Sequence, residues 1–427
     1  MASTRSAAIT GMGAVTPIGV GLPAFAQGLR ESRSGVRLLR FSDERIKSSV
    51  AAECADFDPA AVMAEAELAR VPRLVPMALA AAREAVAQAR LPVGHGADPE
   101  FSRTVGLILG TGAGGIDFTL NQAEAGHQGK RPSLWTITNA THGNLAGELS
   151  IALGLRGPSL CLSTGCASSS DAVGLALDQL RSERPGTPDT WIVVGADAHV
   201  RWETLWGMEL LRVISTRDWR GEPARAHTAS RPFDRTRDGF VLGEGAWAVV
   251  LERPGTARRR EVRALGHVHG YGATCDAYHR VRPDPEMAES VRAMRLAVAD
   301  AGLGMDDIEV VHYHGTSTQM NDAVETQAVK SAFGDHARRL AGHSVKGAIG
   351  HPQGASGLAA MVATLAGLCG ADGGAPFVVP TINLEERDPE CDLEYTANVS
   401  RETSARVALI NCLAFGAKNS ALVVGAG

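Results

Sequence analysis

Short apolar segments alternate along this chain with longer segments in which apolar residues recur at helical spacing. The segments 6–16, 104–110 and 191–196 are short and apolar, which predicts buried strands. The alanine-rich segment 70–90 has helical periodicity, and Pro76 inside it predicts a kink. This alternation of strands and helices predicts an α/β fold with largely buried sheets.

The same order of elements begins again near residue 261. The second series consists of a strand at 261–272, a helix at 287–301, a strand at 308–314, a strand, turn and small-residue helix at 344–368, and closing strands at 408–412 and 420–424. A repeat of element order, without a repeat of residue identity, indicates a duplicated unit. We therefore predict two domains, residues 1–255 and residues 256–427.

One junction between a strand and a helix carries a cysteine. Residues 160–163 predict a short buried strand, Thr164–Gly165 ends it, and a helix follows Cys166. The first N–H groups of a helix lack partners, and the helix dipole favours negative charge there. We therefore expect a lowered pKa and a nucleophilic thiolate at Cys166. A cysteine outside a disulfide is more often a small buried apolar residue, so this reading needs support from other residues.

Two histidines supply that support. In the alignment of the two halves, His351 occupies a place comparable to Cys166, and His314 lies where another strand ends. Functional groups in such folds gather at the carboxyl ends of strands. A cysteine and two histidines converging on one pocket form the constellation that a thiolate enzyme needs. His312 and His314 also form an H-x-H pair, but no carboxylate ligand accompanies it, so we predict no metal site.

Composition excludes several classes of protein. The formal net charge of -5 gives no global basic field for nucleic acid. The 7 cysteines include no C-x-x-C pair, so neither a disulfide framework nor a zinc ribbon is predicted, and a cytoplasmic location fits best. The longest uncharged stretch, 347–371, is interrupted by His351, Pro352 and several glycines, which predicts a buried helix and no membrane span.

Motifs along almost the whole chain identify a family. They are ITGMGAVTPIG at 9–19, STGCASSSDAVG at 163–174, RPFDRTRDGFVLGEG at 231–245, DAYH at 276–279, HGTSTQMND at 314–322, VKGAIGH at 345–351, PTINLEERDPECDLEY at 380–395 and NCLAFGAKNS at 411–420. With these motifs the chain resembles the β-ketoacyl-acyl carrier protein synthases, the condensing enzymes of fatty acid and polyketide synthesis. The resemblance implies a thiolase-like fold, in which two related halves form five layers, α-β-α-β-α, and a dimer.

The resemblance also implies roles for the residues of the reaction centre. Cys166 would accept the acyl chain. His314 and His351 would promote decarboxylation of malonyl-acyl carrier protein and stabilise the enolate, and Lys346 would organise the site. The product would be a 3-oxoacyl-acyl carrier protein, and no cofactor is implied beyond the phosphopantetheine that carries the substrates.

Further residues are implied around this centre. Thr316 and Thr318 would hydrogen-bond the phosphopantetheine arm, and Phe415 would gate the site. The backbone N–H groups of Phe415 and Cys166 would form the oxyanion hole. An acidic carrier protein needs local positive charge for docking, and the candidates, which flank the pocket mouth in the family, are Arg70, Arg73, Arg212 and Arg217.

Two departures concern the pathway. The segment Leu413–Lys418 differs from the usual closing motif, which leaves acyl chain length and type open. Asn321-Asp322 is closer to type II polyketide synthases than to housekeeping fatty acid enzymes. We therefore expect a polyketide or polyene ketosynthase. The alternatives are a housekeeping elongation synthase and a non-catalytic cavity-forming subunit; a thiolase or an initiating synthase fits the motifs less well.

The partner of the dimer stays open at this stage. A homodimer is the simple case, while a specialised ketosynthase would pair with a chain-length factor that lacks the cysteine. A polar loop at 135–147 is expected to reach across the interface, with Thr138, Asn139, Thr141 and His142 available to the partner.

Overall fold

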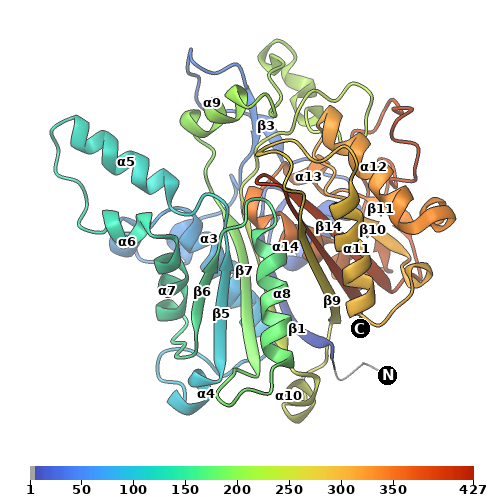
Figure 1. Ribbon diagram of the computed structural model, residues 1–427. Helices are drawn as coiled ribbons and strands as arrows, with labels where there is room; N and C mark the ends of the chain where they lie inside the picture. Colours follow the sequence, from blue (N-terminus) through green and yellow to red (C-terminus); the bar gives the residue numbers. More distant parts are fainter. Residues whose placement is uncertain (1–4) are drawn as a thin grey trace.

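The computed structural model describes residues 5–427, and a single twisted sheet runs through the whole molecule (Figure 1). In its first half the strands follow the order β6 (Ser159–Leu162), β5 (Val105–Gly110), β7 (Thr190–Asp197), β8 (Gly245–Glu252) and β1 (Ala7–Thr16). In its second half the order is β11 (Ala341–His343), β10 (Val310–His312), β14 (Val407–Ala414), β15 (Lys418–Ala426) and β9 (Gly266–Cys275). Matched by chain order, the two orders are identical, which confirms the predicted duplication.

The two half-sheets are joined by hydrogen bonds between β1 and β9, where Ala7–Ile9 run antiparallel to Gly266–Val268. Two helices lie between the halves and contact strands of both, namely α8 (Ser168–Arg181) and α14 (Ser356–Leu368). The outer faces are covered by α3 (Leu74–Gln88) on the first half and by α11 (Ala288–Asp300) and α12 (Gln319–Phe333) on the second. These are the five layers α-β-α-β-α.

The remaining elements are short or peripheral. The helices are α1 (Leu22–Arg30), α2 (Glu65–Leu68), α4 (Pro99–Arg103), α5 (Ile116–His127), α6 (Thr136–Ala140), α7 (His142–Ala152), α9 (Trp202–Leu210), α10 (Pro254–Arg259) and α13 (Lys346–Ile349). The strands are β2 (Gly19–Val20), β3 (Val36–Leu38), β4 (Val50–Ala52), β12 (Phe377–Val378) and β13 (Arg401–Glu402). The predicted division at residue 255 falls inside α10, in the connection between β8 and β9, and we keep a boundary in this connection as a proposal.

Small residues allow the central layer to pack closely. Every residue of α14 is buried, as predicted for the uncharged stretch, and α14 meets α8 at Gly357 and Ser170. A Cβ atom on Gly357 would lie 1.9 Å from Ser170 Oγ, so only glycine fits there. Ser169 Oγ accepts the backbone N–H of Leu358 at 2.9 Å, which adds a polar tie between the two helices. Within residues 5–427, no helix has both the length and the apolar character needed to cross a membrane.

Three local predictions are corrected by the structure. Strand β6 was expected to be buried, but it is an edge strand whose Ser159 and Leu160 are exposed. Helix α3 begins at Leu74, and Pro76 stands in its first turn, where a missing N–H costs no helix hydrogen bond. The expected loop at 135–147 forms α6 and the start of α7 instead.

Asn139 in this region is unavailable to a partner chain. It is buried, and its side-chain amide donates to the backbone oxygens of Arg70 at 2.6 Å and Trp135 at 3.0 Å. The sequence pattern of polar residues did not reveal these internal bonds.

The contact between α8 and α14 predicts the effect of one methyl group. Gly357→Ala forces the two helices apart or Ser170 off its position, and we expect it to lower the free energy of unfolding by about 1–3 kcal/mol. Gly207→Ala in α9 is the matched control, because nothing lies within 4 Å of a Cβ there and alanine favours a helix. Urea unfolding measures both variants, and equal stability of the two would contradict the tight contact.

Candidate active site

Cys166 lies between β6 and α8, at the inner end of a cavity of about 770 Å³. Gly165 before it has φ +67, a left-handed turn that glycine adopts without strain. The turn is fixed by Ser168 Oγ, which donates to the backbone oxygen of Gly165 at 2.6 Å. The thiol is almost completely buried, so a substrate must reach it through the cavity.

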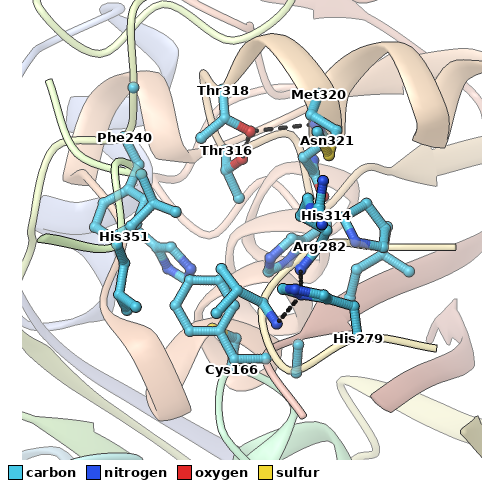
Figure 2. A pocket seen from close by; sticks show the side chains of 18 of the residues that line it. Cys166, Phe240, His279, Arg282, His314, Thr316, Thr318, Met320, Asn321 and His351 are labelled. Atoms are coloured by element: carbon cyan, nitrogen blue, oxygen red, sulfur yellow. Dashed lines mark hydrogen bonds between the residues drawn. The ribbon is translucent and has the colours of Figure 1, made fainter. Parts of the chain in front are cut away.

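The two predicted histidines meet the cysteine at this point, as Figure 2 shows. The Sγ atom of Cys166 and ring nitrogens of His314 and His351 all lie within 4.8 Å of one another. The two rings are nearly perpendicular, at 83°, with their centroids 5.3 Å apart. Three such donors are also close enough to hold a metal ion, although the sequence predicts none.

Hydrogen bonds to other residues fix the position of each histidine. The backbone N–H of His314 donates to Glu325 Oε1 at 2.6 Å, and the backbone N–H of His351 donates to the oxygen of Val241 at 2.7 Å. The hydroxyl of Ser356 lies 3.0 Å from Nδ1 of His351, so this bond fixes the ring orientation. The rings therefore present defined nitrogens to the cavity.

The prediction of a lowered thiol pKa is wrong. Burial raises the pKa of Cys166 to about 11, although the charge of Lys346 and the backbone N–H of Phe415 oppose the rise. Cys166 lies two residues before the first helical residue of α8, and the loss of water around it outweighs the helix terminus. At neutral pH the cysteine is a thiol and must give up its proton when it reacts.

Both imidazoles are neutral at the same pH. Burial, and next the charge of Lys346, holds the pKa of His314 and His351 well below the usual value. Lys346 itself has a lowered pKa because it is buried. Its Nζ donates to the backbone oxygen of His314 at 2.6 Å and lies 3.4 Å from Nδ1 of that ring.

Two carboxylates of α12 support the site, although the sequence does not predict a role for Glu325 and Asp322 serves there only as an indicator of the pathway. Glu325 is fully buried, accepts N–H groups of His314, Gly315 and Asn411, and has its pKa raised to about 7 by burial. Asp322 accepts the backbone N–H of Thr316 at 2.9 Å. Their spacing of three residues places both on one face of the helix, a signal that could have identified them.

The two threonines lie along the cavity wall, away from the sulfur (Figure 2). The hydroxyls of Thr316 and Thr318 are 3.0 Å apart, and Thr318 Oγ1 also accepts the backbone N–H of Asn321 as the N-cap of α12. Phe415 lines the same cavity at the tip of the β14–β15 hairpin. All the residues that the resemblance assigned to the reaction centre therefore surround one cavity, apart from Lys346, which lies behind His314.

The four arginines predicted to receive a carrier protein do not share one environment. Arg73 is paired with the buried carboxylate of Glu244, with Nη2 and Oε1 2.7 Å apart. Arg70 and Arg217 pair with exposed glutamates on their own segments. Arg212 alone of the four lines the cavity, and within residues 5–427 no carboxylate lies at ion-pair distance from it.

Comparisons with known proteins agree with this geometry. Residues 4–257 match the family described as "Beta-ketoacyl synthase, N-terminal domain", and residues 265–384 match its C-terminal domain. The chain belongs to the β-ketoacyl synthase family. It is therefore a condensing acyltransferase, and its substrates travel on the phosphopantetheine of an acyl carrier protein, with no further cofactor.

Individual proteins are similar to the chain over almost their full length. The chain is 36% identical to "3-oxoacyl-[acyl-carrier-protein] synthase 2" of Synechocystis sp., covering 97% of this chain and 96% of that protein. It is 35% identical to "Nodulation protein E" of Rhizobium meliloti, with 98% of each chain covered. Among solved structures, the ishigamide ketosynthase/chain length factor superposes with a TM-score of 0.86 at 29% identity, covering 100% of both chains. A type II PKS ketosynthase bound to the hexaketide, in complex with its acyl-carrier protein, gives 0.87 at 25% identity, covering 99% of this chain and 100% of that one.

The raised pKa of Cys166 predicts how the free thiol responds to pH. Because the reactive thiolate is the minor form below about pH 11, its alkylation rate should rise about tenfold per pH unit between pH 7 and 10. Iodoacetamide labelling followed by peptide mass spectrometry measures this rate. The alkylation rate of the exposed Cys275 in the same sample serves as the control for the activity of the reagent. If the alkylation rate of Cys166 reached a plateau below pH 8, its pKa would be lowered by the helix terminus more than it is raised by burial.

Proposed function

We propose that Cys166, His314 and His351 carry out a decarboxylative Claisen condensation between an acyl chain and malonyl-acyl carrier protein. The observation that carries this proposal is the meeting of one buried thiol with two neutral imidazoles in the wall of one cavity. Each of the three groups has a task in the reaction, and the cavity keeps water from the intermediates.

In the first half-reaction the acyl chain moves to Cys166. Because the thiol is protonated, a neutral imidazole within reach of Sγ accepts its proton as the sulfur attacks the thioester carbonyl. The oxyanion that forms is stabilised by the backbone N–H groups of Cys166 and Phe415. In the free enzyme these two N–H groups already lie at the sulfur and act to lower the pKa of the thiol. The carrier thiol leaves with the proton, and a thioester remains on Cys166.

In the second half-reaction malonyl-acyl carrier protein loses carbon dioxide. The electron pair of the broken bond forms an enolate, whose oxygen accepts hydrogen bonds from N–H groups of His314 and His351. The enolate carbon attacks the acyl thioester, Cys166 leaves as the thiolate, and a 3-oxoacyl-acyl carrier protein forms. Lys346 holds the backbone and ring of His314 in place for this step.

Residues of the cavity wall would bind the phosphopantetheine arm and the carrier protein that deliver the substrate. Thr316 and Thr318 offer hydroxyls to the amides of the phosphopantetheine arm along the wall. Arg212 at the wall supplies positive charge to an acidic carrier protein, and the exposed Arg70 and Arg217 extend this surface. Arg73 contributes less to docking, because the buried Glu244 neutralises it.

A type II polyketide pathway is the second part of the proposal. It rests on Asn321-Asp322 and on the similarity to ketosynthases of that kind among solved structures. Fatty acid elongation is the alternative, and the curated relatives named 3-oxoacyl-[acyl-carrier-protein] synthase 2 favour it. A non-catalytic subunit is disfavoured, because the complete set of thiol, imidazoles and lysine is present.

A dimer through β6 is the third part. Strand β6 ends the sheet with one side unpaired, and its exposed Leu160 has exposed Ile137 and Ile151 on neighbouring elements. An edge strand beside exposed apolar side chains is a surface that a second chain covers. The partner is a second copy or a chain-length factor, and we place this assembly in the cytoplasm, where the seven free cysteines stay reduced.

The two half-reactions predict separable defects. Cys166→Ala should give no acyl adduct and no condensation, because it removes the thiol that accepts the acyl chain. His351→Ala should slow malonyl decarboxylation by about 10²–10³ and acyl transfer less, since the enolate needs both donors while proton transfer needs one base. Mass spectrometry of the acyl adduct and release of labelled carbon dioxide measure the two steps separately.

Cys369→Ala is the matched control, because this half-buried cysteine lies on another cavity and should leave both steps intact. Condensation above a few per cent of wild type in Cys166→Ala would overturn the nucleophile. Equal losses in both steps for His351→Ala would make that histidine a structural residue.

The assembly is tested by expressing the chain alone. If the partner is a chain-length factor, the chain alone should be poorly behaved in light scattering or inactive in elongation assays. An active homodimer that elongates ordinary saturated acyl carriers would exclude the chain-length factor. In either case Leu160→Glu should weaken the dimer, because it buries a charge at the edge of β6.

A further inference from the structure

Gln353 is a further polar side chain at the nucleophile, besides the two histidines. It begins the short 3-10 turn Gln353–Ala355 between His351 and α14, and it is 7% exposed. Its Oε1 accepts the thiol of Cys166, with the two atoms 3.7 Å apart. Within the described part of the chain, its Nε2 has no hydrogen-bond partner.

The backbone holds Gln353 in this position at a cost. Its φ is +43, a left-handed value that is uncommon for residues other than glycine. The next residue is fixed by a bond from the backbone N–H of Gly354 to Asp197 Oδ2 at 2.7 Å. Strain of this kind persists where the surrounding structure enforces it, and it gathers at functional sites.

Acylation of Cys166 changes the surroundings of this amide. The thiol hydrogen is lost when the thioester forms, so Oε1 of Gln353 loses its donor while Nε2 still has no acceptor. A buried amide without partners is costly. The carbonyl oxygen of the thioester is received by the backbone N–H groups of Cys166 and Phe415, and beyond it a fully saturated acyl chain has no polar atom that could pair with the amide.

A second buried group next to the same carboxylate also lacks a partner. His199 is 1% exposed, and neither ring nitrogen has a hydrogen-bond partner among residues 5–427. Its Nδ1 lies 3.9 Å from Oδ1 of Asp197, the residue whose other oxygen holds Gly354. His199 therefore lies beside the carboxylate that fixes Gly354, the neighbour of Gln353, and both of these buried side chains have polar atoms without partners among the described residues.

We propose that Gln353 recognises an oxygen atom on the acyl chain close to the thioester, so that the acyl substrates are 3-oxo or 3-hydroxy chains. This inference rests on the proposed condensation and specifies its acyl substrate. Nε2 donates a hydrogen bond to the substrate oxygen, and Oε1 accepts one from a hydroxyl. A 3-oxo or 3-hydroxy chain therefore gives the side-chain amide of Gln353 a hydrogen-bond partner, which a saturated chain does not.

A pair of substrates that differ in one oxygen tests the proposal. Pantetheine thioesters of hexanoic acid and of 3-hydroxyhexanoic acid are incubated separately with the full-length enzyme, and the acyl adduct on Cys166 is followed by mass spectrometry. The wild type should prefer the 3-hydroxy chain. Gln353→Met, which keeps the length and removes the amide, should lower the ratio of the two acylation rates by about tenfold or more.

The ratio separates recognition from a structural role. If Gln353 only positions the thiol, both substrates slow equally and the ratio stays constant, which would overturn the proposal. Gln27→Met on the exposed face of α1 is the matched control and should not alter the ratio. Gln353→Leu provides a second apolar variant if Gln353→Met does not fold.

Failure of the inference is distinct from failure of the proposed function. Acylation by both substrates with no preference for the 3-hydroxy chain removes the role of Gln353 and leaves the condensation standing. The lack of any adduct on wild-type Cys166 would overturn the acyl-transfer step, and the inference with it.

Discussion

The side chain of Asp197 holds the reaction centre together. It ends β7, is fully buried, and its oxygens accept four bonds, from Thr111 Oγ1 and from the backbone N–H groups of Gly112, Ala113 and Gly354 at 2.7–2.9 Å. A buried carboxylate is stable only when such donors replace its water. Three of the donors belong to the first half of the chain and one to the second, so a single charge ties the cysteine side of the site to the histidine side.

The close contact of α8 and α14 depends on the same arrangement. The turn that leads from His351 into α14 is fixed by Asp197, and α14 then meets α8 without room for a side chain at Gly357. Cys166 and His351 precede these two helices. The backbone positions of Cys166 and His351 are therefore set by helix packing, and the hydroxyl of Ser356 then orients the imidazole.

Much of this arrangement could be predicted from the sequence, because it depends on local patterns. Strand ends and small-residue helices placed Cys166 and His351 in equivalent positions of a duplicated unit, and the motifs named Thr316, Thr318 and Phe415. The pKa of Cys166 could not be predicted, since it depends on how completely other segments exclude water. The exposure of β6 and the buried bonds of Glu325 and Asn139 likewise arise from segments that meet only in the folded chain.

The pairing of β1 with β9 has a consequence for how substrates enter. Because one continuous hydrogen-bonded sheet spans both halves, the halves cannot open and close about a hinge as separate lobes do. Any change in access to the sulfur would therefore come from the loops around the cavity. Phe415 sits at the tip of the β14–β15 hairpin, where Ala414 pairs with Lys418, and Gly416 and Ala417 have left-handed φ values. If Phe415 gates the site as we propose, a swing of this short tip, with both strands anchored in the sheet, would admit the acyl chain without disturbing the positions of Cys166, His314 and His351.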